Sequence, residues 1–390
     1  MKEQKEKPTA TSARTSGNTV LIVNPSSSGG ATGDNWDVIY TTIKGIFGEN
    51  PEVAFSKKPG SGTTLAREYL KKGFKNIVAI GGDGTINEVS NGFFYYDEED
   101  KEKTGVGGIH RSPTTSTAVP TNNDHKSDDN DSNNITNTIP DWPTLRQINP
   151  DATLGIISSG TRNVLVKSLN LPAGLEQSCQ SFVDGKLQKI DVIAAIVTDP
   201  NDHLKKAPMR IFLNAAEIGV AAEIIDRSKK IRDKVKSRFI STVSSMVATM
   251  PTYQSNLCEI SVYNGQDTNA NNNILTNMTM CIVANGKYLG GGLTAAPQAS
   301  VSDGLLDIVI LKDSGSVKML KEFASMKKMK QNGGYTVDDK DILYMKAKGV
   351  SIKSKEEENK RDVTVTVDGE PIGILPASFR IYKNALTVKM

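Results

Sequence analysis

The sequence is poor in the residues that build disulfide frameworks, zinc sites and histidine-centred active sites. Only three cysteines, Cys179, Cys258 and Cys281, occur in 390 residues, and they lie far apart without the spacing of paired ligands. The chain also has only three histidines. We therefore expect no disulfide framework and no zinc site, and a reducing cytoplasm as the compartment.

Long apolar runs and an excess of one charge are lacking as well. No stretch approaches the roughly 20 apolar residues of a membrane-spanning helix. With 47 Lys+Arg against 44 Asp+Glu, no global field favours nucleic acid as a partner. Residues 1–17 are mostly polar, so we expect a disordered tail there and no secretory signal.

Residues 18–171 alternate short apolar runs with helical patterns, which is typical of a parallel sheet covered by helices. This predicts an α/β nucleotide-binding domain. Strands are expected at Thr19–Val23, Val53–Phe55, Asn76–Ile80 and Thr153–Ile157. Between about residues 97 and 150 the chain is rich in Asp, Asn, Thr, Ser and Pro, which predicts a disordered insertion.

Residues 172–390 have a different pattern, in which strand-like runs are joined mostly by turns. An antiparallel, β-rich domain is expected, with one helical region at about Val220–Met250. Asp199–Lys206 and Asn264–Asn277 look like further insertions. The last strand, at about Ala385–Val388, is compatible with a return to the first domain.

A glycine turn carries the strongest chemical signal of the first domain. It consists of Gly81, Gly82, Asp83, Gly84 and Thr85, directly after a predicted strand and at the start of a predicted helix. Glycines let a ligand come close to the backbone, and a helix start offers N–H groups to phosphate. Asp83 could orient a metal-bound or water-bridged phosphate, and Thr85 could donate its hydroxyl. The alternative is a tight turn with a helix cap.

A second polar loop, Asn24–Gly30, follows the first predicted strand and contains clustered hydroxyls and glycines. Alone it is an ordinary Ser/Gly loop. Ligands of parallel sheets bind at the carboxyl ends of the strands, where the loops after the first, third and fourth strands meet. This shared edge predicts that Asn24–Gly30 helps to hold a triphosphate.

With these loops the chain resembles the diacylglycerol kinase catalytic-domain family, which includes bacterial-type diacylglycerol kinases, related lipid kinases and sphingosine kinases. The motifs that carry the resemblance are Asn24-Pro25, Gly81–Val89, Gly160–Asn163, Gly290–Gly292, Ser302–Asp307 and Val367–Glu370. The resemblance implies a phosphofructokinase/NAD kinase-like α/β domain followed by an antiparallel β-sandwich. It also implies ATP as the phosphate donor.

The resemblance assigns a set of residues to ATP binding. They are Asn24, Pro25, Ser26, Ser27, Ser28, Lys57, Gly81, Gly82, Asp83, Gly84, Thr85, Ile86, Asn87 and Thr161. Several positions depart from the family pattern. Ser28 replaces a glycine, Ser302 an acidic residue, Val164 an aspartate and Glu217 a small residue, and Lys57 lies near the position of a hydroxyl residue.

The resemblance also implies the chemistry. Glu370 would be the base that takes the proton of a lipid hydroxyl, with Asp368 beside the transferring phosphate. Asp303, with the main-chain oxygens of Ser300 and Leu305, would hold Mg²⁺, and Asp191 would reach that ion through water. Phosphoryl transfer needs an oriented hydroxyl and charge neutralisation, and Mg²⁺ prefers oxygen ligands.

Both acidic segments have an ordinary structural alternative. Asp368-Gly369 between two strands is a strong signal for a β-hairpin turn, with or without a catalytic role. Asp303-Gly304 is likewise typical of a turn.

A basic segment lies in the second domain. Arg227–Arg238 contains seven Lys/Arg and one acidic residue, with Ile231, Val235 and Phe239 at helical spacing. Such a helix could dock on anionic lipids, or it could be a solvated helix that packs its apolar stripe on the β domain.

The function expected from these features is an ATP- and Mg²⁺-dependent lipid kinase that phosphorylates a primary hydroxyl of a lipid such as diacylglycerol. We expect it in the cytoplasm, peripherally associated with a membrane, and a homodimer is compatible with the sequence. The alternatives are an NAD kinase-like enzyme and a non-catalytic relative that binds nucleotide or lipid.

Overall fold

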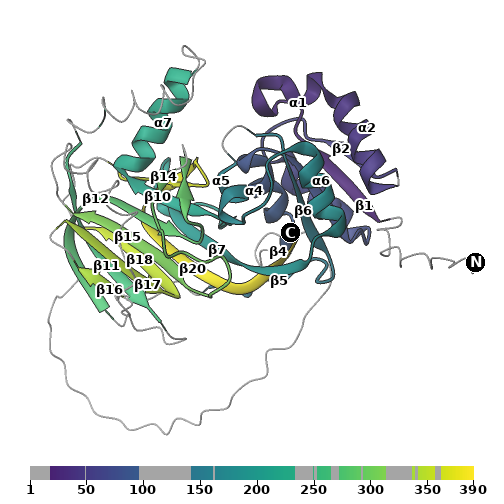
Figure 1. The fold of residues 1–390 in the computed structure, drawn as a ribbon. Coiled ribbons are helices and arrows are strands. Elements are labelled where there is room, and N and C mark those ends of the chain that lie inside the picture. Colours follow the sequence, from purple (N-terminus) through teal and green to yellow (C-terminus); the bar gives the residue numbers. More distant parts are fainter. Residues whose placement is uncertain are drawn as a thin grey trace, which may run out of the picture.

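The structure is a computed structural model of the chain. It describes residues 18–48, 50–95, 142–160, 163–232, 249, 253–264, 272–290, 293–312, 336–338, 341–355 and 362–390. Two domains lie side by side, an α/β domain and a β-rich domain, as Figure 1 shows. The tail 1–17 and most of the predicted insertion, residues 96–141, lie outside the described residues.

The α/β domain is built on four parallel strands. Their spatial order is β2 (Glu52–Phe55), β1 (Thr19–Val23), β3 (Asn76–Gly81) and β6 (Thr153–Ser158). In β1, β3 and β6 almost every side chain is buried, as expected for a parallel sheet that is covered on both faces.

Helices cover both faces of this sheet. On one face Leu21 and Val23 pack with α2 (Trp36–Phe47) and α6 (Leu175–Asp184). On the other, Val20 and Ile22 pack with α3 (Ser61–Lys71) and α4 (Asp83–Asn91). The alternation of side chains along a strand produces this division. Two short helices, α1 (Ala31–Asp34) and α5 (Val164–Ser168), follow the loops after β1 and β6.

The second domain is antiparallel. Its main strands are β7 (Leu187–Asp199), β8 (Asp202–Lys206), β9 (Arg210–Phe212), β10 (Ala215–Gly219), β11 (Asn256–Tyr263), β12 (Asn272–Ala284), β15 (Leu306–Lys312), β16 (Thr336–Asp338), β17 (Ile342–Ala347), β18 (Gly349–Ser354), β19 (Thr364–Val367) and β20 (Glu370–Lys389). Two minor pairs are β4 (Phe94–Tyr95) with β5 (Arg146–Gln147), and β13 (Tyr288–Leu289) with β14 (Leu293–Thr294). One helix, α7 (Val220–Arg232), lies beside β10 and β12 (Figure 1).

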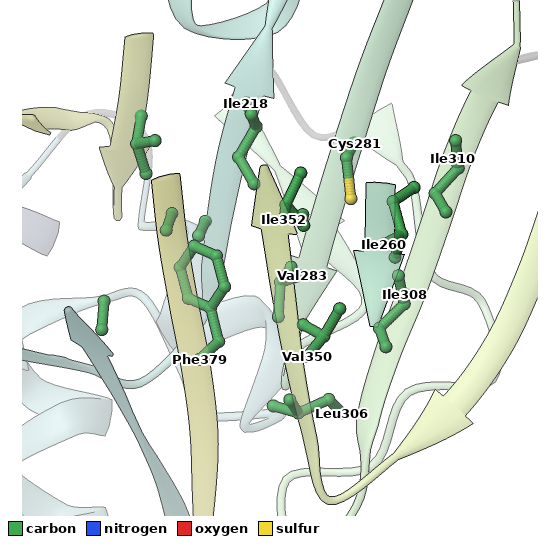
Figure 2. Packing of buried hydrophobic residues seen from close by; sticks show 14 of the residues in the cluster. Ile218, Ile260, Cys281, Val283, Leu306, Ile308, Ile310, Val350, Ile352 and Phe379 are labelled. Carbon is green, nitrogen blue, oxygen red and sulfur yellow. The ribbon is translucent and has the colours of Figure 1, made fainter. Parts of the chain in front are cut away.

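Apolar side chains from the strands of the second domain form two core clusters. The smaller one includes Met280 and Ile282 of β12 and packs with α7, and the larger one lies among the strands. Figure 2 shows Phe379 of β20, Ile218 of β10, Ile260 of β11 and Ile352 of β18 in this cluster. All four side chains are buried. This packing makes the antiparallel domain a sandwich in which strands far apart in sequence share one interior.

Two long strands connect the domains. β7 and β20 run antiparallel to each other, and Figure 1 shows them passing from the sandwich to the α/β domain. At its far end β20 joins the first sheet, where Val388 pairs with Leu154 of β6 in parallel. The sheets of the two domains are therefore joined through hydrogen-bonded strands.

The expected fold class, an α/β domain followed by an antiparallel β-rich domain, is confirmed. Two predicted insertions were wrong in part. Asp202–Lys206 forms β8 against β7, and Asn272–Asn277 is the first half of β12 against β11. In both, strand pairing outweighs the polar composition. Among the described residues no helix is both long and apolar enough to cross a membrane.

Candidate active site

The glycine turn opens α4 at the carboxyl end of β3. The first helical hydrogen bond runs from Ile86 N–H to Gly82 O at 3.1 Å, and no side chain caps the helix. The N–H groups of the first turn therefore have no partner inside the helix, and the positive end of the helix dipole lies at Gly82–Thr85. This is the geometry expected of a phosphate-binding turn.

The Asn24–Gly30 loop is hydrogen-bonded to that turn. Asn24 Nδ2 donates to Thr85 Oγ1 at 3.0 Å, and Asn24 N–H donates to Ile80 O at 3.0 Å. Ser26 N–H in turn donates to Asn24 Oδ1 at 3.0 Å. The side chain of Asn24 thus fixes the first loop to the glycine turn.

Ser28 has φ +54°, which explains why glycine would suit this position. Its hydroxyl donates to Ser159 O, in the loop after β6. The serine therefore tolerates the left-handed backbone and gains a contact that glycine could not make.

A cluster of hydroxyls joins the Asn24–Gly30 loop to the loop after β6. The sequence motifs did not predict this cluster. Ser27 Oγ lies 2.6 Å from Thr32 Oγ1 and 3.1 Å from Ser159 Oγ, and Thr32 Oγ1 donates to Ser159 Oγ at 2.9 Å. The position of Ser159 directly after a parallel strand was the available signal, since such loops meet at one edge of the sheet.

The loops after β3 and β6 approach each other closely at two glycines. A Cβ on Gly160 would stand 2.5 Å from Gly82 Cα, so only glycine fits there. Beside this contact Asn163 Oδ1 is buried without a hydrogen-bond partner in the described part of the chain. Thr161, assigned to ATP, lies outside the described residues.

Asp83 and Glu88 of α4 hold neighbouring elements. Asp83 Oδ1 accepts the N–H of Leu165 at 3.2 Å and so connects α4 to the start of α5. The Glu88 carboxylate accepts the N–H groups of Gly60 at 2.8 Å and Gly62 at 2.9 Å. Glu88 thereby anchors the loop that carries Lys57, whose side chain is exposed.

Asp368 and Glu370 come from the hairpin between β19 and β20. Asp368 and Gly369 have φ of +47° and +83°, as in a tight hairpin turn, and Val367 pairs with Glu370. The alternative expectation, a β-hairpin turn at Asp368-Gly369, is therefore confirmed for the backbone. The same turn also directs both carboxylates towards α4.

The Asp368 carboxylate is surrounded by N–H donors. Asn87 Nδ2 donates to it at 2.8 Å, and the backbone N–H groups of Leu213, Asn214 and Ala215 donate at 3.3, 3.2 and 3.1 Å. Burial raises the pKa of Asp368 to about 6, although these donors pull it down. This carboxylate joins α4, the loop between β9 and β10, and the hairpin, and thereby positions Glu370.

Glu370 lies against the glycine turn. A Cβ on Gly84 would stand 3.2 Å from Glu370 Oε1, and the Glu370 side chain is exposed. A carboxylate from the end of the chain thus meets the start of α4, 286 positions earlier in the sequence. A carboxylate and a helix start suited to phosphate are therefore adjacent.

Two of the expected Mg²⁺ ligands, the carboxylates of Asp303 and Asp191, already accept hydrogen bonds from the protein. Asp303 Oδ2 accepts from Lys346 Nζ at 2.9 Å, and Asp303 Oδ1 accepts the N–H of Leu305 at 3.0 Å. Both oxygens of Asp191 accept backbone N–H groups, from Gly304 at 2.6 Å and Asn384 at 2.7 Å.

Within the described residues no three His, Cys, Asp or Glu side chains gather as a metal site. Burial by itself would lower the pKa of Lys346, but Asp303 and Asp307 outweigh it and the pKa is raised, so the ammonium stays charged. With Lys346 beside Asp303 and both oxygens of Asp191 bonded to backbone N–H groups, these two carboxylates do not fit a divalent ion in this arrangement.

Comparisons with known proteins identify the family of the chain. The family model described as "Diacylglycerol kinase catalytic domain" matches residues 18–109 and 132–195, and the "YegS C-terminal NAD kinase beta sandwich-like domain" matches residues 215–390. The diacylglycerol kinase of Bacillus subtilis is 23% identical over 330 residues, 83% of this chain and 81% of that protein. The probable lipid kinase YegS of Escherichia coli is 23% identical over 329 residues, 82% of each chain.

Solved structures show the same fold. A crystal structure of a diacylglycerol kinase from Bacillus anthracis superposes with a TM-score of 0.56 at 20% identity and covers 95% of this chain and 96% of its own. Another structure from that organism has a TM-score of 0.61 at 21% identity, and the match covers 96% of this chain and 98% of that one. Together with the two family models, which follow one another along most of the sequence, these similarities show that the chain belongs to the diacylglycerol kinase catalytic-domain family of lipid kinases.

Proposed function

We propose that this chain is an ATP-dependent lipid kinase that transfers the γ-phosphate of ATP to a primary hydroxyl of a lipid such as diacylglycerol. The observation that carries the proposal is the position of Glu370 against Gly84, at the start of α4. Mg²⁺ enters the reaction as the counterion of the ATP phosphates and thus as part of the substrate.

In the proposed reaction the ATP phosphates lie on the N–H groups of Gly82–Thr85, where the helix dipole favours negative charge. The lipid hydroxyl gives its proton to the Glu370 carboxylate as its oxygen attacks the γ-phosphorus. A new P–O bond forms, the bond from the γ-phosphorus to the β–γ bridging oxygen breaks, and ADP leaves with that oxygen.

Asn87 and Asp368 have a positioning role in this proposal. Asn87 Nδ2 donates to Asp368 Oδ2 at 2.8 Å and to Ile211 O at 3.1 Å. These bonds fix the β19–β20 hairpin to the second turn of α4. The distance between the base and the phosphate-binding turn is therefore defined by hydrogen bonds inside the protein.

The Glu370→Gln variant tests the proposed base. It keeps the shape of the side chain but removes its basicity, so we expect transfer from ATP to diacylglycerol in mixed micelles to fall about 100- to 10,000-fold. ATP binding should be unchanged. Glu176→Gln, an exposed change on α6, is the matched control and should keep full activity. Kinase activity that survives Glu370→Gln would contradict the assignment.

The acceptor is tested by supplying several hydroxyls at once. The protein is incubated with labelled ATP, Mg²⁺ and a total lipid extract, and in parallel with NAD. We expect label in a lipid phosphate that Glu370→Gln does not form. Label in NADP would favour the NAD kinase-like alternative, and label in neither would favour a non-catalytic relative.

We also propose that the basic segment Arg227–Arg238 docks on anionic lipid headgroups. Val220 and Ile224 at the start of α7 are buried in the sandwich domain, so the helix that leads into the segment is anchored. Each basic residue near an anionic surface contributes on the order of 1 kcal/mol. Reversing the charge of Lys229, Lys230, Arg232 and Lys236 should therefore reduce co-sedimentation with anionic vesicles, and unchanged sedimentation would contradict the proposal.

A further inference from the structure

A lysine ammonium occupies an oxygen cage in the second domain. Lys346 Nζ, on β17, lies 2.9 Å from Asp303 Oδ2, 3.1 Å from Gln298 O and 3.3 Å from Asp307 Oδ2. The ammonium donates hydrogen bonds to Asp303 Oδ2 and Gln298 O, and it forms an ion pair with Asp307 Oδ2. The Lys346 side chain is only 13% exposed and Asp307 is fully buried, so the cage is largely closed to water.

This donor set is of the kind that a hard divalent cation selects. Two carboxylates and one main-chain carbonyl surround a positive charge, and all three ligands come from one short stretch, residues 298–307. A bound ion would hold such a loop by binding it at several points. Lys346 makes the same contacts from a neighbouring strand.

The loop held in this way contacts the two strands that connect the domains. Gly304 N–H donates to Asp191 Oδ2 of β7 at 2.6 Å, and Asp191 N–H donates to Val301 O at 2.7 Å. Asn384 N–H of β20 donates to Asp191 Oδ1 at 2.7 Å. A cation at Asp303 thus orders a loop that braces β7 against β20.

We propose that Lys346 is a built-in cation that replaces a bound divalent ion at Asp303, so that this loop is ordered without metal. In the proposed kinase, Mg²⁺ is then needed only with ATP. The inference concerns the metal site of that kinase, but its test measures ion binding and stability without nucleotide, so it can fail while the proposed activity stands.

The test compares Lys346→Met with Lys348→Met, using the whole chain without nucleotide. Methionine keeps most of the side-chain length but removes the charge, and Lys348 is an exposed neighbour just beyond β17. Thermal unfolding is measured in EDTA and in MgCl₂ or CaCl₂. We expect equal melting temperatures in both media for the unchanged chain and for Lys348→Met.

Lys346→Met should melt on the order of 5–10 °C lower in EDTA, because it leaves the buried Asp307 and the partly exposed Asp303 without a cation. It should regain part of this loss with MgCl₂ or CaCl₂, since the emptied cage can then take an ion. Stabilisation of the unchanged chain by these salts, or heat of Mg²⁺ binding to it in calorimetry without nucleotide, would overturn the inference. A Lys346→Met that melts like the unchanged chain would also overturn it.

A second variant keeps the test decisive if Lys346→Met folds poorly. Asp303→Asn combined with Lys346→Met removes one unpaired carboxylate and the main ion ligand together. We expect this double variant to melt above Lys346→Met in EDTA and to lose the response to MgCl₂. A double variant that responds to MgCl₂ as strongly as Lys346→Met would show that the ion binds elsewhere, and the inference would fail.

Discussion

Gly84 is the residue at which the proposed base, Glu370, meets the glycine turn. It has helical geometry in α4, so alanine there should stabilise the helix by up to about 1 kcal/mol. The added Cβ would stand 3.2 Å from Glu370 Oε1 and push the carboxylate away. We therefore expect Gly84→Ala to melt at or above the temperature of the unchanged chain and to lose roughly 10-fold or more in kinase turnover.

Gly45→Ala is the matched control for Gly84→Ala. Gly45 also lies inside a helix, α2, and a Cβ there meets no atom within 4 Å. The Gly45→Ala variant should gain a similar amount of stability, and its kinase turnover should equal that of the unchanged chain. Equal turnover in the two variants would contradict the close approach of Glu370 to Gly84.

The raised pKa of Asp368 predicts a pH dependence of stability. Burial lifts the pKa from its usual 3.8 to about 6 in the folded protein, so between these values the folded state binds more protons than the unfolded state. The Asp368 carboxyl group therefore adds to the free energy of unfolding below about pH 4, and this contribution is lost as the pH rises to about 6. We expect the stability of the unchanged chain, relative to Asp368→Asn, to fall between pH 4 and pH 6.5 in urea unfolding. Parallel pH curves would contradict the shifted pKa.

At the scale of residues, the sequence predicted those parts of the candidate site that lie in contiguous motifs. The glycine turn and the Asp368-Gly369 hairpin are contiguous, and their local geometry follows from the residue types. Lys346 was not predictable, because it is 43 positions from Asp303 and reaches it only through the pairing of β15 with β17. Ser159 is likewise 132 positions from Ser27.

At the scale of elements, α4 is joined to the second domain through Asn91. Its Oδ1 accepts the N–H of Ile211 at 3.0 Å and its Nδ2 donates to Ile211 O at 2.7 Å, while the side chain is buried. Asn91→Leu would leave these buried backbone groups of β9 without this partner. We expect the free energy of unfolding to fall by about 2–4 kcal/mol in urea titration, with a loss of turnover because Asn87 and Asp368 shift.

A surface asparagine provides the comparison for Asn91→Leu. Asn18 makes an exposed hydrogen bond to Gly73 O, so Asn18→Ala should change the free energy of unfolding by less than about 0.5 kcal/mol. If Asn91→Leu lowered the free energy of unfolding no more than Asn18→Ala does, the hydrogen bonds from Asn91 to β9 would not be what holds α4 on the second domain.

The parallel strands were predictable as elements, because their apolar runs end in glycine or polar loops. The length of β20 could not be predicted from the sequence pattern. Gly373 and Pro376 interrupt its pattern, and the register against β7 shifts twice, between Ile374 and Ala377 and between Tyr382 and Leu386. Sequence periodicity therefore found only its last few residues, whereas the pairing with β7 makes one strand of twenty residues.

At the scale of the whole molecule, the strands that join the domains predict a single unfolding transition. Trp36 and Trp142 lie in the first domain, and Cys258 and Cys281 are buried in the second. In a Cys179→Ala background, tryptophan fluorescence and thiol labelling should report the same urea midpoint. Two separate midpoints would mean that the domains unfold independently despite β7 and β20.

The continuity of β20 has a consequence for how the enzyme can move. Its first residue, Glu370, lies against the glycine turn, and Val388 near its other end is paired with the parallel sheet of the α/β domain. A hinge motion that separated the domains would have to break strand pairing along β20. In the proposed kinase, nucleotide exchange should therefore proceed through rearrangement of surface loops while Glu370 and the glycine turn keep their spacing. The reactive geometry is then completed when the chain folds, before either substrate arrives.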